Sequence, residues 1–176
     1  KGRSCLVMKI KKNIALSLIA GTLLGHLFGT SQKMKKINEQ ANKWKRESDK
    51  YEQTLLMTIR WLKVKMENGK LEDYFLQKGY HTIAIYGMNY VGVRLYEELE
   101  GTSIKVLYGI DKYTSSSEVN IPVYSLEKNL DEVDAVVVTP VYYYEEIRQD
   151  LSRKLKSPVI SMNDVLFEGR SIIREL

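Results

Sequence analysis

The sequence predicts an α/β fold: a small doubly wound, mainly parallel sheet of about five strands, preceded by an apolar helix and a long helical stalk. Three observations support this prediction. In residues 70–176, short apolar segments alternate with amphipathic ones. Residues 135–138 are continuously apolar, which is typical of a strand covered on both faces. Residues 13–30 carry no Asp, Glu, Lys or Arg, and residues 31–66 contain no glycine or proline.

The charge is divided unevenly along the chain. Residues 1–69 contain 15 Lys and Arg against 5 Asp and Glu, whereas residues 70–176 contain 12 against 17. A basic arm beside an acidic domain favours a membrane surface or an acidic partner, and disfavours nucleic acid. The single cysteine, Cys5, excludes an internal disulfide and a cysteine-based metal site, and the two histidines are too few for a His-rich one. We therefore expect no metal.

A basic flank, residues 1–12, precedes the apolar segment 13–30, for which we predict a transmembrane or signal-anchor helix. From Ile14 to Thr30 it has 17 residues, at the short end of the roughly 17–25 that cross a bilayer. A cleavable signal peptide and a buried soluble helix remain alternatives. Gly21, Gly25 and Gly29 would lie on one helix face and favour pairing of two helices. More lysines follow the segment than precede it, which predicts a single pass with the C-terminal domain in the cytoplasm.

Residues 31–69 are predicted to form a helical stalk. Apolar residues recur there at alternating steps of three and four, the a/d pattern of a coiled coil, over about four heptads. This heptad seam consists of Met34, Ile37, Ala41, Trp44, Tyr51, Leu55 and Leu62, with Ser48 and Thr58 filling the pattern. It predicts a parallel homodimer. The alternative is an amphipathic helix that packs on its own domain, and Leu56, Ile59 and Trp61 broaden the apolar face near its end, where they favour docking.

The domain proper is expected in residues 70–176. A short helix over 71–79 ends at Gly79. The expected strands are residues 81–87, 103–111, 121–129 (a short strand and a turn of helix), 133–140 and 158–162, and the expected helices between and after them are residues 90–100, 142–155 and 163–169. Strands that alternate with helices at this spacing predict the doubly wound order third, second, first, fourth, fifth.

The turn after the first strand resembles a dinucleotide-binding fingerprint with one glycine replaced. Gly87 and Gly92 supply the first and third glycines, for the tight turn and for close packing of helix on strand. Asn89 stands in place of the second, where a pyrophosphate would approach; asparagine tolerates left-handed backbone better than most residues. Met88, Tyr90 and Val91 complete the candidate anion-binding turn. The alternative is that both glycines serve only the turn and the packing.

Three further segments are expected to face the same crevice. Asp111 ends the second strand 24 residues after Gly87, near the roughly twenty-residue offset of a carboxylate that binds ribose hydroxyls. Lys112 beside it could contact a phosphate. Thr139 and Pro140 leave the fourth strand at the carboxyl edge. Asp111 as an ordinary turn residue and Lys112 as a solvated side chain remain alternatives.

The runs IAIYGMNYVGVRLYEELEGTSIKVLYGID and VDAVVVTPVYYYEEI resemble the Rossmann-like nucleotide-binding modules of bacterial surface-polysaccharide biosynthesis, which occur beside or fused to glycosyltransferases and sugar-modifying enzymes. The resemblance covers about residues 70–168. It implies an NAD(P) or nucleotide-sugar ligand bound through Gly87, Gly92 and Asp111, and a glycosyltransferase as a partner. Asn89 departs from the glycine-rich pattern.

Catalytic signatures are sparse in the domain. No nucleophile elbow and no Walker lysine is present, and His81 stands at the start of the first expected strand, at the wrong end of the sheet for a crevice base. Binding is therefore favoured over catalysis. The sequence predicts a membrane-anchored accessory protein that binds a nucleotide or nucleotide-sugar in cell-surface polysaccharide biosynthesis. The alternatives are a NAD- or nucleotide-sugar-dependent oxidoreductase completed by a partner chain, and a dimeric scaffold whose nucleotide site is dead.

Overall fold

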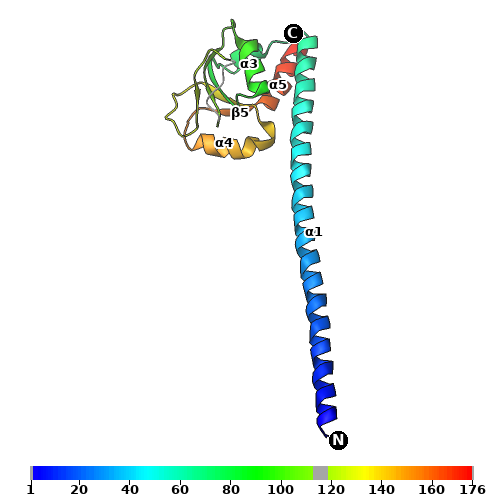
Figure 1. Cartoon of the computed structure of the whole chain (residues 1–176). Coiled ribbons are helices and arrows are strands. Elements are labelled where there is room, and N and C mark those ends of the chain that lie inside the picture. Colours follow the sequence, from blue (N-terminus) through cyan, green and yellow to red (C-terminus); the bar gives the residue numbers. More distant parts are fainter. Residues whose placement is uncertain (1, 113–118, 176) are drawn as a thin grey trace. The chain divides into compact units, whose positions relative to one another are not determined.

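The computed structural model describes the backbone of residues 2–112 and 119–175, and the side chains of residues 31–112 and 119–168. The chain divides into two compact units, residues 1–48 and residues 49–176. A single long helix, α1 (Gly2–Met66), supplies the first unit and the beginning of the second (Figure 1).

The first unit contains the N-terminal part of α1. Its side chains from residue 31 to residue 46 are exposed. The predicted membrane segment, residues 13–30 with Gly21, Gly25 and Gly29, is helical in its backbone, and its side chains lie outside the described set. Among the residues described, no helix is both long and apolar enough to cross a membrane. Membrane anchoring thus stays a prediction from the sequence.

The second unit contains a five-stranded parallel sheet. Its strands are β1 (Thr82–Tyr86), β2 (Lys105–Ile110), β3 (Val123–Tyr124), β4 (Ala135–Val138) and β5 (Val159–Ser161). Their spatial order is β3-β2-β1-β4-β5, with every neighbouring pair parallel. This confirms the predicted α/β sheet and its strand order, and all four residues of β4 are buried, as their continuous apolar run predicts. The arrangement is compatible with a Rossmann-like fold.

Helices cover both faces of this sheet. They are α2 (Leu71–Gln77), α3 (Tyr90–Leu99), α4 (Tyr144–Ser152), preceded by a turn of 3-10 helix, η1 (Val141–Tyr143), and α5 (Met162–Glu175). In Figure 1, α3 and α5 lie on one side of the strands and α4 on the other. Ile83 and Ile85 of β1 pack in the core with α3 and α5, whereas Ala84 between them packs in the core with α4. This alternation places β1 at the centre of the domain.

Two predicted elements differ in the structure. The segment 121–129 forms only the short strand β3 and no helix, because its later residues make an isolated turn in which the Lys128 amide donates to the Ser125 carbonyl at 3.1 Å. The last helix starts at Met162, where the Ser161 hydroxyl accepts a hydrogen bond from the Asn163 amide at 3.2 Å, and continues to Glu175. An isolated glycine such as Gly169 costs a helix only about 1 kcal/mol and need not end it.

The end of α1 belongs to the core of the second unit. Met57 and Val64 are 0% and 1% exposed and share a cluster with Leu71 and Phe75 of α2. The helix ends at Met66. Asn68, two residues later, has a left-handed φ of +58°, and the Gly69 amide donates to the Val64 carbonyl at 2.8 Å. The sequence analysis starts the domain at residue 70, whereas the compact unit starts at residue 49 because these buried side chains come from the helix before it.

Candidate functional site

The turn after β1 requires glycine at its first position. Gly87 has a φ of +90°, and a Cβ added there would lie 2.7 Å from Pro140 Cδ and from Thr139 Oγ1. Its amide donates to the Ile110 carbonyl at 2.8 Å. The turn therefore packs tightly against the segments that follow β2 and β4. Gly87 permits this tight turn, as the first glycine does in the dinucleotide-binding fingerprint.

Gly92 lets α3 approach β1 closely. A Cβ at this position would lie 2.2 Å from the Gly87 carbonyl oxygen and 3.1 Å from its carbon. No side chain fits at that distance without a shift of backbone. Gly92 thus has the packing role that the third glycine has in the fingerprint.

Asn89 is the N-cap of α3. Its backbone is extended, with φ −86° and ψ −167°, and its side-chain Oδ1 accepts a hydrogen bond from the Val91 amide at 3.0 Å. The left-handed tolerance of asparagine, which the sequence analysis invokes, is therefore not used. The capping role could have been found from the sequence, because asparagine directly before an amphipathic run is a common N-cap signal.

Asp111 connects the end of β2 to the turn. Its Oδ2 accepts a hydrogen bond from the Met88 amide at 2.8 Å, and its own amide donates to the Tyr124 carbonyl at 2.9 Å. Burial first, and then negative charge that includes Asp111, raises the pKa of the Tyr86 hydroxyl at the end of β1. The carboxylate thus lies beside the turn, bonded to its Met88 amide. That it binds a ribose stays a prediction from the sequence.

Thr139 closes the other side of the turn. It is 2% exposed, and its hydroxyl donates to the Gly87 carbonyl at 2.7 Å. Pro140 follows it beside Gly87. Lys112 is exposed, and Tyr90, at 88% exposure, projects from the start of α3. The structure therefore brings Gly87, Gly92, Asp111, Thr139 and Pro140 together at the carboxyl ends of β1, β2 and β4.

These residues lie where parallel α/β sheets bind ligands, outside the carboxyl ends of the strands near the point where the strand order reverses. We keep the name crevice for the region that these residues define. Two of its amides, however, are bonded by the protein's own side chains: that of Met88 by Asp111 and that of Val91 by Asn89. A pyrophosphate in the turn would have to replace both bonds and would lie beside a carboxylate. Ribose hydroxyls suit the carboxylate better, because they donate hydrogen bonds to it.

Three Tyr-x-x-x-Lys spacings, which the sequence analysis missed, begin at Tyr74, Tyr108 and Tyr124. On a helix this spacing can join a catalytic tyrosine to a lysine that lowers its pKa. Here burial raises the pKa of Tyr74, and the Lys78 ammonium is paired with Glu168 at 2.7 Å. Burial also raises the pKa of Tyr108 to about 12, and its hydroxyl donates to the Asp131 carbonyl.

The third pair differs in kind, because the Lys128 ammonium lies 3.5 Å from the centre of the Tyr124 ring rather than one helical turn along from its hydroxyl. The pKa values of the two buried tyrosines, Tyr74 and Tyr108, are raised away from the range that acid–base catalysis at neutral pH requires.

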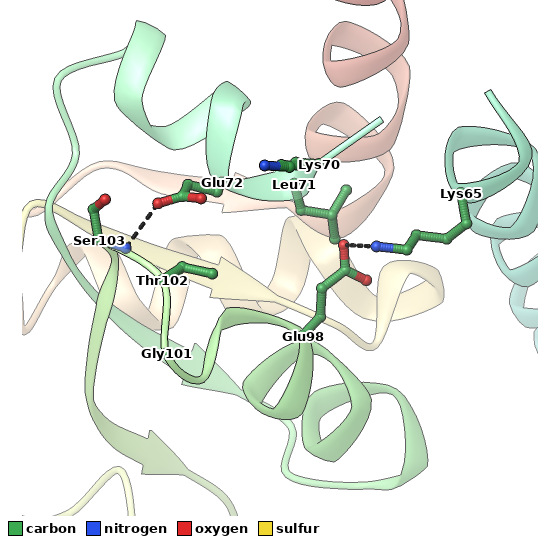
Figure 2. A pocket seen from close by; sticks show the side chains of 8 residues that line it. All are labelled: Lys65, Lys70, Leu71, Glu72, Glu98, Gly101, Thr102 and Ser103. Carbon is green, nitrogen blue, oxygen red and sulfur yellow. Dashed lines mark hydrogen bonds and ion pairs between the residues drawn. The ribbon is translucent and has the colours of Figure 1, made fainter. Parts of the chain in front are cut away.

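A cavity of about 580 Å³ opens near the amino end of β2. Figure 2 shows its lining, in which Glu72 accepts a hydrogen bond from the Ser103 amide at 2.7 Å and Lys65 pairs with Glu98 at 2.9 Å. The Ser103 bond lowers the pKa of the Glu72 carboxyl. These contacts join α1 to α3 and α2 to the loop that precedes β2.

The described residues contain no cluster of three or more His, Cys, Asp or Glu side chains placed to hold a metal ion. No family model, curated protein sequence or solved structure matches this chain. The function is therefore argued from the residues and their geometry.

Proposed function

We propose that this protein is a membrane-anchored, dimeric accessory of cell-surface polysaccharide biosynthesis, whose α/β domain binds a nucleotide or nucleotide-sugar at the carboxyl ends of β1, β2 and β4. The observation that carries the proposal is the contact between the Asp111 carboxylate and the Met88 amide, at 2.8 Å. It fixes a negatively charged acceptor at the carboxyl edge, beside a turn whose Gly87 and Gly92 have the fingerprint's steric roles.

Each residue of the crevice has a distinct task in this proposal. Asp111 accepts hydrogen bonds from the ribose hydroxyls of NAD(P) or a nucleotide-sugar. Thr139 holds the Gly87 carbonyl and so keeps the turn in place. Lys112, exposed next to Asp111, supplies positive charge for a phosphate. Since Asn89 and Asp111 occupy two turn amides, the nucleoside rather than the pyrophosphate supplies most of the affinity.

The anchor and the dimer rest on the sequence of the first unit. The uncharged segment 13–30 spans the membrane once, and the lysines that follow it hold the domain in the cytoplasm. Gly21, Gly25 and Gly29 pair with the same face of a second copy. A glycosyltransferase that uses the same nucleotide-sugar is the expected partner.

The test is calorimetric titration of the full chain, in detergent, with NAD, NADP and UDP-sugars. We expect saturable binding, weakened about 10- to 100-fold in Asp111→Asn, because a hydrogen bond to a charged group contributes about 1.5–3 kcal/mol. The matched control is Asp134→Asn. Asp134 also accepts backbone amide hydrogen bonds, from His81 at 2.8 Å and Thr82 at 2.7 Å, but at the amino end of β1. Equal weakening by both variants would remove the assignment of the site.

One specific observation favours a second candidate, a dimeric scaffold with a closed site. The turn's Met88 and Val91 amides already have side-chain acceptors, so the loop is complete without a ligand. In this case none of the nucleotides binds at millimolar concentration, and Asp111→Asn lowers the thermal stability without changing any titration.

A further inference from the structure

An apolar groove separates the end of α1 from α3. Its volume is about 720 Å³, and its lining includes Thr54, Trp61 and Leu62 from α1 and Tyr90 and Val91 from α3. The exposed fractions are 88% for Tyr90 and 58% for Leu62. Large side chains exposed together in this way mark a surface that another apolar element covers.

The heptad seam of α1 is distinct from the face that packs on the domain. Met57 and Val64 point into the core, and the Trp61 indole donates to Glu98 at 2.6 Å. The seam residues of the same unit, Tyr51, Leu55 and Leu62, are 72%, 60% and 58% exposed. Docking on the domain therefore uses residues other than Tyr51, Leu55 and Leu62, although Lys65, at the d position that follows Leu62, pairs with Glu98 of α3 at 2.9 Å. The apolar side chains of these three seam residues stay largely exposed within the described part of the chain.

The residues that flank the seam indicate what covers it. With Met34 at position a, the e positions are Asn38, Lys45, Glu52, Ile59 and Met66. Charged or polar residues are usual at e, and the first three obey this. Ile59 and Met66, by contrast, are apolar and exposed, at 50% and 84%. Along α1 these two are the e residues nearest the groove.

A parallel coiled coil explains why the change occurs there. In such a pair, each e residue faces the g residue five positions earlier on the other helix. Ile59 of a second copy would thus face Thr54, and its Met66 would face Trp61. Thr54 and Trp61 both line the groove, so the two unusual e residues meet an apolar surface that α3 widens.

From this we infer that the groove between α1 and α3 binds α1 of a second copy of this chain, parallel and in register, with the second copy's Ile59 and Met66 seated against Trp61 and Tyr90. The inference deepens the dimer of the proposed function and rests on it. It adds α3 to the interface, so that the domain itself, and not only the stalk, recognises the second copy.

The available area is sufficient. Tyr51, Leu55, Leu62, Ile59, Met66 and Tyr90 are each at least half exposed. Side chains of this size offer up to ~200 Å² each, so these six provide on the order of 700 Å² per copy, near the ~800 Å² per partner of a specific interface. The seam residues of the first unit, Met34, Ile37 and Trp44, are also more than half exposed.

Cross-linking of the full chain tests register and direction. In a Cys5→Ser background, Leu62→Cys places a thiol at position a, which faces its own counterpart only when the helices are parallel and in register. We expect a disulfide-linked dimer on mild oxidation, at least tenfold more than from Gln53→Cys. Gln53 is the matched control, because it is exposed on α1 at position f, on the outer face. Equal cross-linking of the two variants would overturn the inference.

A second pair of variants tests the groove. Differently tagged copies carrying Ile59→Cys and Tyr90→Cys are co-expressed and treated with a short bismaleimide. A mixed cross-link at least tenfold above that of Gln53→Cys with Tyr90→Cys supports the contact with α3, whereas none would reduce the interface to the stalk and overturn the role of the groove. Neither readout depends on a nucleotide, so a failure here is distinct from a failed titration of the crevice.

Discussion

Replacing Gly92 by alanine tests the close approach of α3 to β1, on which the crevice depends. Two effects oppose each other. In an ordinary helix interior, alanine would be more stable than glycine by about 1 kcal/mol. At Gly92 the new Cβ would lie 2.2 Å from the Gly87 carbonyl oxygen, a distance that forces backbone to move. Overpacking of this kind costs about 3 kcal/mol, at the upper end of its usual range, because the neighbour is backbone.

The clash should therefore outweigh the propensity, with a net loss of about 2 kcal/mol and a fall in Tm of about 8 °C. The assay is urea and thermal unfolding of the full chain, followed by circular dichroism. Gly101→Ala is the control: its φ of +78° carries a strain of about 1 kcal/mol, with nothing within 4 Å of the added Cβ. If Gly92→Ala were as stable as the parent chain or more so, the close approach of helix and strand would be refuted.

Three further predictions concern the rest of the chain. Met57→Ala should cost about 3 kcal/mol in urea unfolding, since Met57 is 0% exposed, whereas Gln53→Ala should change the stability little; equal losses would place the end of α1 outside the core. Hydrogen bonds from the His81 amide first, and then from Thr82, lower the pKa of Asp134 below its ordinary 3.8. The ionised Asp134 therefore stabilises the fold fully above pH 3.8, and this stabilisation is lost as the pH falls through the lowered pKa. The Tm deficit of Asp134→Asn should thus be larger at pH 7 than at pH 2.5, and a constant deficit would contradict this. Glu52→Lys should strengthen the dimer in sedimentation equilibrium, because in a parallel pair residue 52 faces Glu47 of the second copy, and the substitution replaces a repulsion by an attraction. In an antiparallel pair with full overlap, residue 52 would instead face Lys45, so a weaker dimer would indicate antiparallel pairing.

The sheet could be predicted from the sequence because its signals are local. The apolar run from Ala135 to Val138 and the alternating segments around it specify strands covered on both faces, and these admit few topologies. The boundary of the domain could not be found in this way. Met57 and Val64 lie on one face of α1 and the seam residues on another, and both faces are apolar. Only the folded structure shows which face meets the domain.

The crevice shows the same limit at the level of single residues. Spacing alone placed Gly87, Gly92 and Asp111 in the right relation, since a strand, a turn and a helix of standard length bring them together. It could not show that Asp111 would bond the Met88 amide, because that contact depends on a side-chain rotamer and on the exact height of the turn above β2. Nor could it show that Asn89 would cap α3 in place of a missing glycine.

In the proposed nucleotide site, these two side chains would decide how a ligand is held. Asn89 and Asp111 provide from within the chain the acceptors that a pyrophosphate would provide from outside, so the turn is stable when empty. A nucleotide then gains little from the turn and must be recognised through its sugar and base. For that reason, affinity should depend on the nucleoside far more than on the number of phosphates. Comparable binding of UDP and uridine would support this view, and a hundredfold preference for UDP would mean that the turn opens to receive phosphate.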